Sequence, residues 1–206
     1  MSDLRKWFGP SREEIWQQVA NAIGGKYTDG DFWSNRGRVE ATHGQWIVTL
    51  DNHVVSTGKS AISYTRMRAP YVNPGKFRFT IYRRGIFSNL GKKLGMQDVD
   101  IGDPAFDDAF IIKGNDENKL RQLFADARLR ELISAQPSIH FSVKDDETAF
   151  WNSRNFPADV DELYFEVTGV IKDTERLKFL FDLLAETLDQ LCRMGEAYEK
   201  APGVTL

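Results

Sequence analysis

The feature that most constrains the fold is an apolar stripe near the end of the chain. Between residues 174 and 199, apolar side chains recur at intervals of three and four, which places them on one side of an α-helix. The members of this stripe are Leu177, Leu180, Phe181, Leu184, Leu188, Leu191 and Cys192. Because a helix of this kind must bury its apolar side, we expect it to cover one face of a β-sheet.

The first half of the chain predicts one helix followed by a run of strands. Ser11 and Glu14 have the spacing of a capping box, so a helix is expected from about residue 11 to 23. Segments rich in Val, Ile, Thr, Tyr and Phe then alternate with turn residues, which is typical of an antiparallel meander. These segments are 37–42, 45–51, 61–68 and 76–83.

The second half mixes strands and helices. We expect a helix near 116–135 and a last helix over 174–199, with strands near 108–113, 138–143, 147–151 and 162–168. The predicted fold class is therefore α+β, with one or more antiparallel or mixed sheets of about seven to eight strands packed against three helices. A single domain over residues 1–206 is expected, with a possible subdomain boundary near 88–106 unless strands pair across it.

The composition predicts a folded, soluble, cytoplasmic protein. Of the 206 residues, 41% are hydrophobic and 28% are charged, which is within the range of globular proteins. The single cysteine, Cys192, excludes an internal disulfide and favours a reducing compartment. The N-terminus lacks the apolar stretch of a secretory signal, and no stretch of the chain is apolar enough for a transmembrane segment.

Charge is strongly segregated along the chain. Residues 54–97 contain no Asp or Glu, whereas residues 98–117 contain seven acids and only one base, Lys113. The bases of the first segment are Lys59, Arg66, Arg68, Lys76, Arg78, Arg83, Arg84, Lys92 and Lys93. A net charge of -3 for the whole chain hides this asymmetry.

Strand alternation predicts that four of these bases share one sheet face. If segments 61–68 and 76–83 form a hairpin that keeps apolar side chains together, Arg66 and Arg68 lie beside Lys76 and Arg78. Like charges directly opposite each other destabilise a sheet, so something must neutralise this face. The candidates are an outside anion, the acidic segment 98–117, or solvent.

These observations lead to a first hypothesis and two alternatives. The first is a non-enzymatic protein that binds a protein or anionic partner, nucleic acid or anionic lipid included, through this face and the nearby lysines. Its predicted binding residues are Arg66, Arg68, Lys76, Arg78, Lys92 and Lys93. The second is a small-molecule-binding or hydrolytic enzyme with an acidic cleft formed by Asp98, Asp100 and Asp103. The third is a subunit of an assembly with an interface around Trp7 and Phe8.

No recognised catalytic, metal or cofactor motif is present. His43, His53 and His140 have no second histidine or cysteine at metal-ligand spacing, and Cys192 lies on the apolar stripe of a helix. There is no phosphate-binding loop or dinucleotide fingerprint. We therefore predict no catalytic residue, no metal site and no cofactor, and treat enzymatic activity as the less favoured possibility.

One stretch carries a loose family resemblance. The sequence FDDAFIIKGNDENKLRQLF at 106–124, followed by LYFEVTGV at 163–170 and the closing helix, resembles bacterial families of domains of unknown function. The resemblance covers the second half of the chain. It implies a bacterial cytosolic protein and carries over no site residue.

Overall fold

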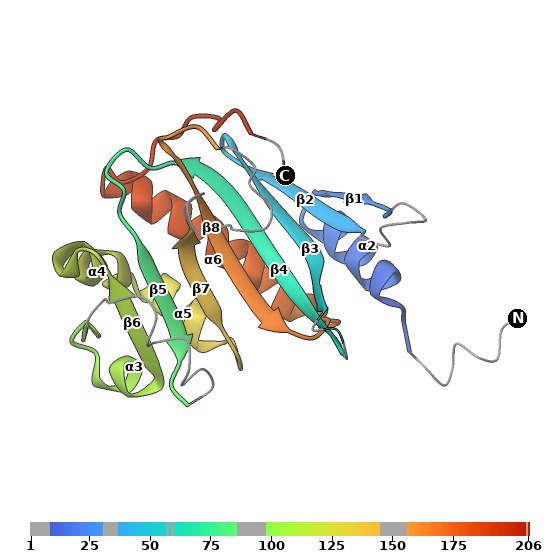
Figure 1. Ribbon diagram of the computed structural model, residues 1–206, viewed down its shortest axis with the longest axis horizontal. Helices are drawn as coiled ribbons and strands as arrows, with labels where there is room; N and C mark the ends of the chain where they lie inside the picture. The colour runs from blue at the N-terminus through green and yellow to red at the C-terminus, as the bar shows by residue number, and fades with distance from the viewer. Residues whose placement is uncertain are drawn as a thin grey trace, which may run out of the picture.

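The computed structural model describes residues 9–30, 37–56, 58, 60–85, 98–144, 156–204 and 206. Figure 1 shows the arrangement of the helices and strands. The helices are α2 (Arg12–Ala22), α3 (Pro104–Ala109), α4 (Glu117–Phe124), α5 (Ala127–Ser134) and α6 (Thr174–Arg193). The strands are β1 (Lys26–Thr28), β2 (Arg38–His43), β3 (Trp46–Ser56), β4 (Ala61–Val72), β5 (Phe79–Arg83), β6 (Phe110–Gly114), β7 (His140–Lys144) and β8 (Val160–Thr168).

All eight strands form one antiparallel sheet with the order β1-β2-β3-β4-β8-β7-β5-β6. Strand β8 from the second half of the chain pairs with β4 from the first half, so the two halves share a sheet. The predicted α+β class and the predicted number of strands are thus confirmed.

The described residues form five helices where three were expected. The helix expected over 116–135 is divided into α4 and α5, because the Asp126 side chain accepts a hydrogen bond from Leu129 N and caps a new helix. The additional short helix α3 begins with Asp103 as its cap and Pro104 at its first turn. Local capping residues therefore define more helix starts than periodicity alone indicated.

The predicted hairpin between segments 61–68 and 76–83 is wrong. Strand β5 pairs with β6 and β7, while β4 pairs with β3 and β8. The meander is correct for β2, β3 and β4 only, because β8 and β7 are inserted between β4 and β5. The strand expected at 147–151 lies outside the described residues.

The hydrophobic core lies between the sheet and the helices, which are grouped on one face of the sheet (Figure 1). The apolar stripe of α6 is buried as predicted, with Cys192 only partly buried at its end. Phe79 of β5 packs edge-on against Phe124 of α4 and Phe141 of β7, with ring centroids 5.7 and 5.4 Å apart. This packing holds the end of the sheet formed by β7 and β5 against α4.

None of the helices in the described part of the chain is both long enough and apolar enough to cross a bilayer.

Candidate binding site on the helix-free face of the sheet

The two faces of the central strands differ in chemistry. One face points toward the helices, and its side chains are apolar and buried in the core. They include Leu50 of β3, Met67 of β4, Phe165 of β8 and Phe141 of β7. No helix of the described residues covers the opposite face (Figure 1). The alternating positions on that face are mostly polar. We call the polar side chains at the centre of this face the polar cluster. Its members are Asp51 of β3, Arg66 and Arg68 of β4, Glu162, Tyr164 and Glu166 of β8, and Ser142 and Lys144 of β7.

The strand register places these side chains directly beside one another. Arg66 lies opposite Asp51 on one side and opposite Glu166 on the other. Tyr164 lies opposite Arg68 on one side and opposite Ser142 on the other. Because paired residues of neighbouring strands point to the same face, the cluster is a consequence of backbone pairing.

Asp51 neutralises both arginines. Its Oδ1 accepts a hydrogen bond of 2.7 Å from Arg66 Nε, and its Oδ2 accepts bonds of 2.9 Å from Arg66 Nη2 and 2.6 Å from Arg68 Nη2. Burial opposes ionisation of the carboxyl group, but the Arg66 hydrogen bond and both guanidinium charges outweigh it and lower the pKa of Asp51. Within the described residues, no acid of segment 98–117 pairs with these arginines; their carboxylate partner is Asp51 of β3.

Lys144 and Tyr164 form a second contact in the cluster. Lys144 Nζ lies 3.1 Å from the centroid of the Tyr164 ring, and the Tyr164 hydroxyl donates a 2.5 Å hydrogen bond to Glu166 Oε2. Burial lowers the pKa of Lys144 to about 8, although the charges of Glu166 and Glu162 act in the opposite direction. The pKa of His140 is also lowered, mainly by burial and to a smaller extent by the positive charge of Lys144.

Three buried polar atoms of the cluster have no hydrogen-bond partner among the described residues: Ser142 Oγ, Glu162 Oε1 and Arg68 Nε. Ser142 is 4% exposed and Glu162 is 9% exposed, so neither is well solvated. Glu162 Oε1 is 3.7 Å from Arg68 Nη1, too far for a hydrogen bond, and burial raises the pKa of the carboxyl group. Since an unpaired buried polar group costs about 1–3 kcal/mol, these atoms are suited to binding a polar ligand.

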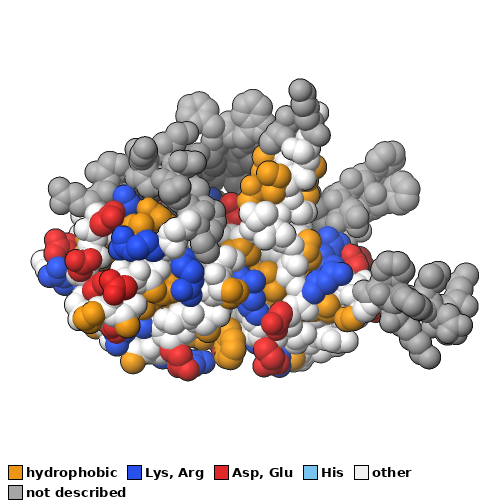
Figure 2. Space-filling view, turned by 90° about the horizontal axis from the view of Figure 1, so that it is seen from below, with side chains coloured by type: hydrophobic (Ala, Val, Ile, Leu, Met, Phe, Trp, Pro, Cys, Tyr) orange, Lys and Arg blue, Asp and Glu red, His pale blue; other side chains and the backbone are white. Residues whose placement is uncertain are grey.

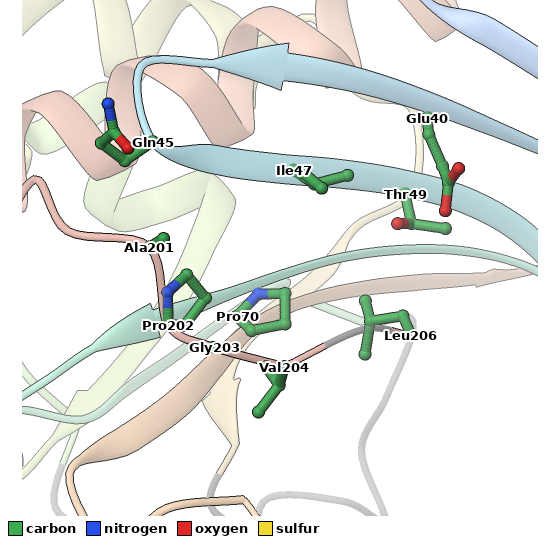
Figure 3. Close-up of a pocket in the computed structure, with 10 residues that line it drawn as sticks. All are labelled: Glu40, Gln45, Ile47, Thr49, Pro70, Ala201, Pro202, Gly203, Val204 and Leu206. Carbon is green, nitrogen blue, oxygen red and sulfur yellow. The ribbon is translucent and has the colours of Figure 1, made fainter.

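A pocket adjoins the polar cluster on the same face. Its cavity volume is about 200 Å³, and it lies between β2, β3 and β4 on one side and residues 201–204 and Leu206 on the other (Figure 3). The lining is mixed, with apolar groups such as Ile47, Pro70 and Val204 beside the polar Thr49. Thr49 lies opposite Arg68, and Pro70 lies opposite Glu162, so the pocket and the cluster are in direct strand-to-strand contact.

The basic residues predicted to form one binding surface do not assemble in that way. Only Arg66 and Arg68 lie in the polar cluster. Lys76 Nζ is 3.3 Å from Asp161 Oδ1, and Asp161 alternates toward the helix-covered face. Arg78 precedes β5, where its backbone N–H donates to Asn115 Oδ1. The remaining two, Lys92 and Lys93, lie outside the described residues, and a binding role for the set stays a prediction.

The acids of the alternative hypothesis have separate structural contacts. Asp98 Oδ1 lies 3.0 Å from Lys113 Nζ. Asp103 caps α3, and its Oδ2 lies 3.3 Å from Arg130 Nε, while the Asp100 carbonyl oxygen accepts a bond from Arg121 Nε. No contact among the described residues joins the three acids, and their role as an acidic site stays a prediction.

Neither a metal site nor a reactive thiol emerges from the described part of the chain. No group of three His, Cys, Asp or Glu side chains there is arranged to hold a metal ion. His43 Nε2 lies 2.9 Å from Asp189 Oδ1, and burial raises the pKa of the Cys192 thiol. Trp7 and Phe8 lie outside the described residues.

The comparisons with known proteins found no matching family model, no matching curated protein and no matching solved structure.

Sequence reasoning missed most of the polar cluster. Asp51, Ser142, Lys144, Glu162 and Tyr164 were not predicted as site residues. The available signal was alternation: polar residues occupy every second position in the predicted strands 138–143 and 162–168. That pattern indicated a polar face, but not which strands share it.

Proposed function

We propose that this protein is a non-enzymatic binding protein whose ligand is a small organic anion held on the helix-free face of the sheet. The acidic group of the ligand contacts the polar cluster, and its apolar part lies in the adjoining pocket. The proposal rests on two buried donors, Arg68 Nε and Ser142 Oγ, which have no hydrogen-bond partner among the described residues and lie on the same face as a pocket with apolar walls.

The charges of the site favour a small ligand over a polyanion. Arg66 and Arg68 already share Asp51, so the face has no large excess of positive charge with which to attract nucleic acid at long range. On the side of the molecule shown in Figure 2, basic and acidic side chains are interspersed. A short anion needs only local donors, and Arg68 Nε and the Ser142 hydroxyl are such donors.

The ligand class is tested with three probes of equal chain length: hexanoate, hexanol and hexylamine. We expect hexanoate to bind most tightly in isothermal titration calorimetry, because only its carboxylate accepts hydrogen bonds from two donors. Ser142→Ala should weaken hexanoate binding about tenfold, the effect of losing one hydrogen bond to a charged group. It should leave the stability of the free protein unchanged or slightly higher, because it removes an unpartnered buried hydroxyl.

Ser63→Ala provides the matched control. Ser63 lies on β4 near the hairpin end, opposite Val54, and away from the polar cluster. Its substitution should leave hexanoate binding unchanged. Equal affinity for the acid and the alcohol, or equal losses in the two serine variants, would rule out the proposed function.

A further inference from the structure

Lys144 differs from most of the described lysines in what surrounds its amine. Four others have a carboxylate oxygen close to Nζ: Lys76 at 3.3 Å, Lys113 at 3.0 Å, Lys119 at 2.7 Å and Lys178 at 2.8 Å. At Lys144 no ion pair forms with any described residue, and Nζ lies instead over the face of the Tyr164 ring. Among the described residues, Lys144 thus lacks the carboxylate contact that holds those four lysines as ammonium ions.

We propose that Lys144 is a nucleophilic amine that forms an imine with small aldehydes. The proposal concerns a covalent reaction that the non-covalent binding proposed above does not require. Its basis is a partly buried amine with no carboxylate partner among the described residues, on the strand face that also carries Arg66, Arg68 and the hydroxyl of Ser142.

The charged groups around Lys144 come from four strands. His140 lies on the same strand, and Glu162, Tyr164 and Glu166 lie on β8. The other charged groups are Arg66 and Arg68 of β4, together with Asp51 of β3, which pairs with both arginines. Burial and the two arginines favour the neutral amine, while Glu166 and Glu162 favour the ammonium ion; the sum lowers the pKa of Lys144 to about 8.

The reaction balances without an oxidant or reductant. The lone pair of Nζ forms a bond to the carbonyl carbon, and the carbonyl oxygen takes up a proton. The resulting carbinolamine loses its oxygen as water when nitrogen gives up its second proton and forms the C=N bond. Only the neutral amine reacts, so the rate depends on its fraction at the working pH.

The experiment uses glyoxylate as the aldehyde and sodium cyanoborohydride to trap the imine, with peptide mass spectrometry to locate the label. At pH 7, about one-tenth of an amine with the pKa of Lys144 is neutral, against less than about one-thousandth of an ordinary lysine. Allowing for partial burial, we expect Lys144 to be labelled at least about tenfold faster than Lys178, which is on the surface of α6. Its rate should level off above about pH 8.

Two variants separate a reactive amine from a merely accessible one. Glu166→Gln removes a negative charge that favours the ammonium ion, so labelling of Lys144 at pH 7 should accelerate. Glu175→Gln removes the partner of Lys178 and should leave the Lys144 rate unchanged. Circular dichroism confirms that both variants are folded. Labelling of Lys144 no faster than that of Lys178, or a rate that still rises above pH 9, would overturn the proposal.

Discussion

Replacing Asp51 by asparagine tests whether the polar cluster is held together by one carboxylate. Asp51 is 8% exposed and accepts hydrogen bonds from both Arg66 and Arg68. Asparagine keeps the volume and one acceptor oxygen, but it removes the negative charge. The guanidinium groups of Arg66 and Arg68 would then lie side by side on β4, with Glu162, 3.7 Å from Arg68, and Glu166, opposite Arg66, in partial compensation.

The expected loss is about 2–4 kcal/mol of unfolding free energy. Removing one partner of a buried ion pair costs about 3–5 kcal/mol, and the side chains here retain 11–19% exposure, which reduces the cost. For a chain of this length, 1 kcal/mol corresponds to about 2–4 °C in Tm. We therefore expect Tm to fall by roughly 5–15 °C.

The effect should also depend on pH. The pKa of Asp51 is lowered in the folded protein. Its contribution to the free energy of unfolding is therefore fully present at pH values above its pKa in the unfolded chain, about 3.9. As pH falls below about 4 and toward the lower folded-state pKa, the contribution is lost, and the difference between wild type and Asp51→Asn should shrink. Urea titrations at pH 7 and pH 3 measure this difference.

Glu131→Gln is the matched control for an acid-to-amide change at an ion pair. Glu131 lies 2.8 Å from Arg128, but the two side chains are 70% and 46% exposed. A surface pair of this kind contributes about 0–1 kcal/mol. If Asp51→Asn costs no more than Glu131→Gln, the reasoning about the polar cluster is refuted.

Two further changes test the fold. Asn73→Ala should lower the free energy of unfolding by about 2–4 kcal/mol, measured by urea titration. The reason is that the buried Asn73 amide forms hydrogen bonds with the backbone of Phe77 and the carboxylate of Asp161. A loss below about 1 kcal/mol would contradict this. Ser11→Ala should cost about 1 kcal/mol by removing the acceptor for Glu14 N in the capping box of α2, and an unchanged Tm would show that the cap does not contribute.

The elements that sequence predicted well depend on local signals. The stripe of α6 is visible because a helix repeats every 3.6 residues, and Ser11 marks the start of α2 because its side chain bonds a backbone group three residues away. Strands β2, β3 and β4 were recognised for the same reason, since short turns join them and their side chains alternate. In each case the interacting residues are close in the chain.

The candidate site depends on contacts between residues far apart in the chain. Tyr164 lies between Arg68 and Ser142 only because β8 pairs with β4 across about ninety residues and then with β7. Sequence correctly identified Arg66 and Arg68 as unusual, but it assigned them the wrong neighbours. Propensity and periodicity describe a residue's own strand, whereas strand order is decided by the packing of the whole core, which no local pattern records. Sequence by itself therefore indicated most of the helices and strands, and only the tertiary structure decided which charges meet.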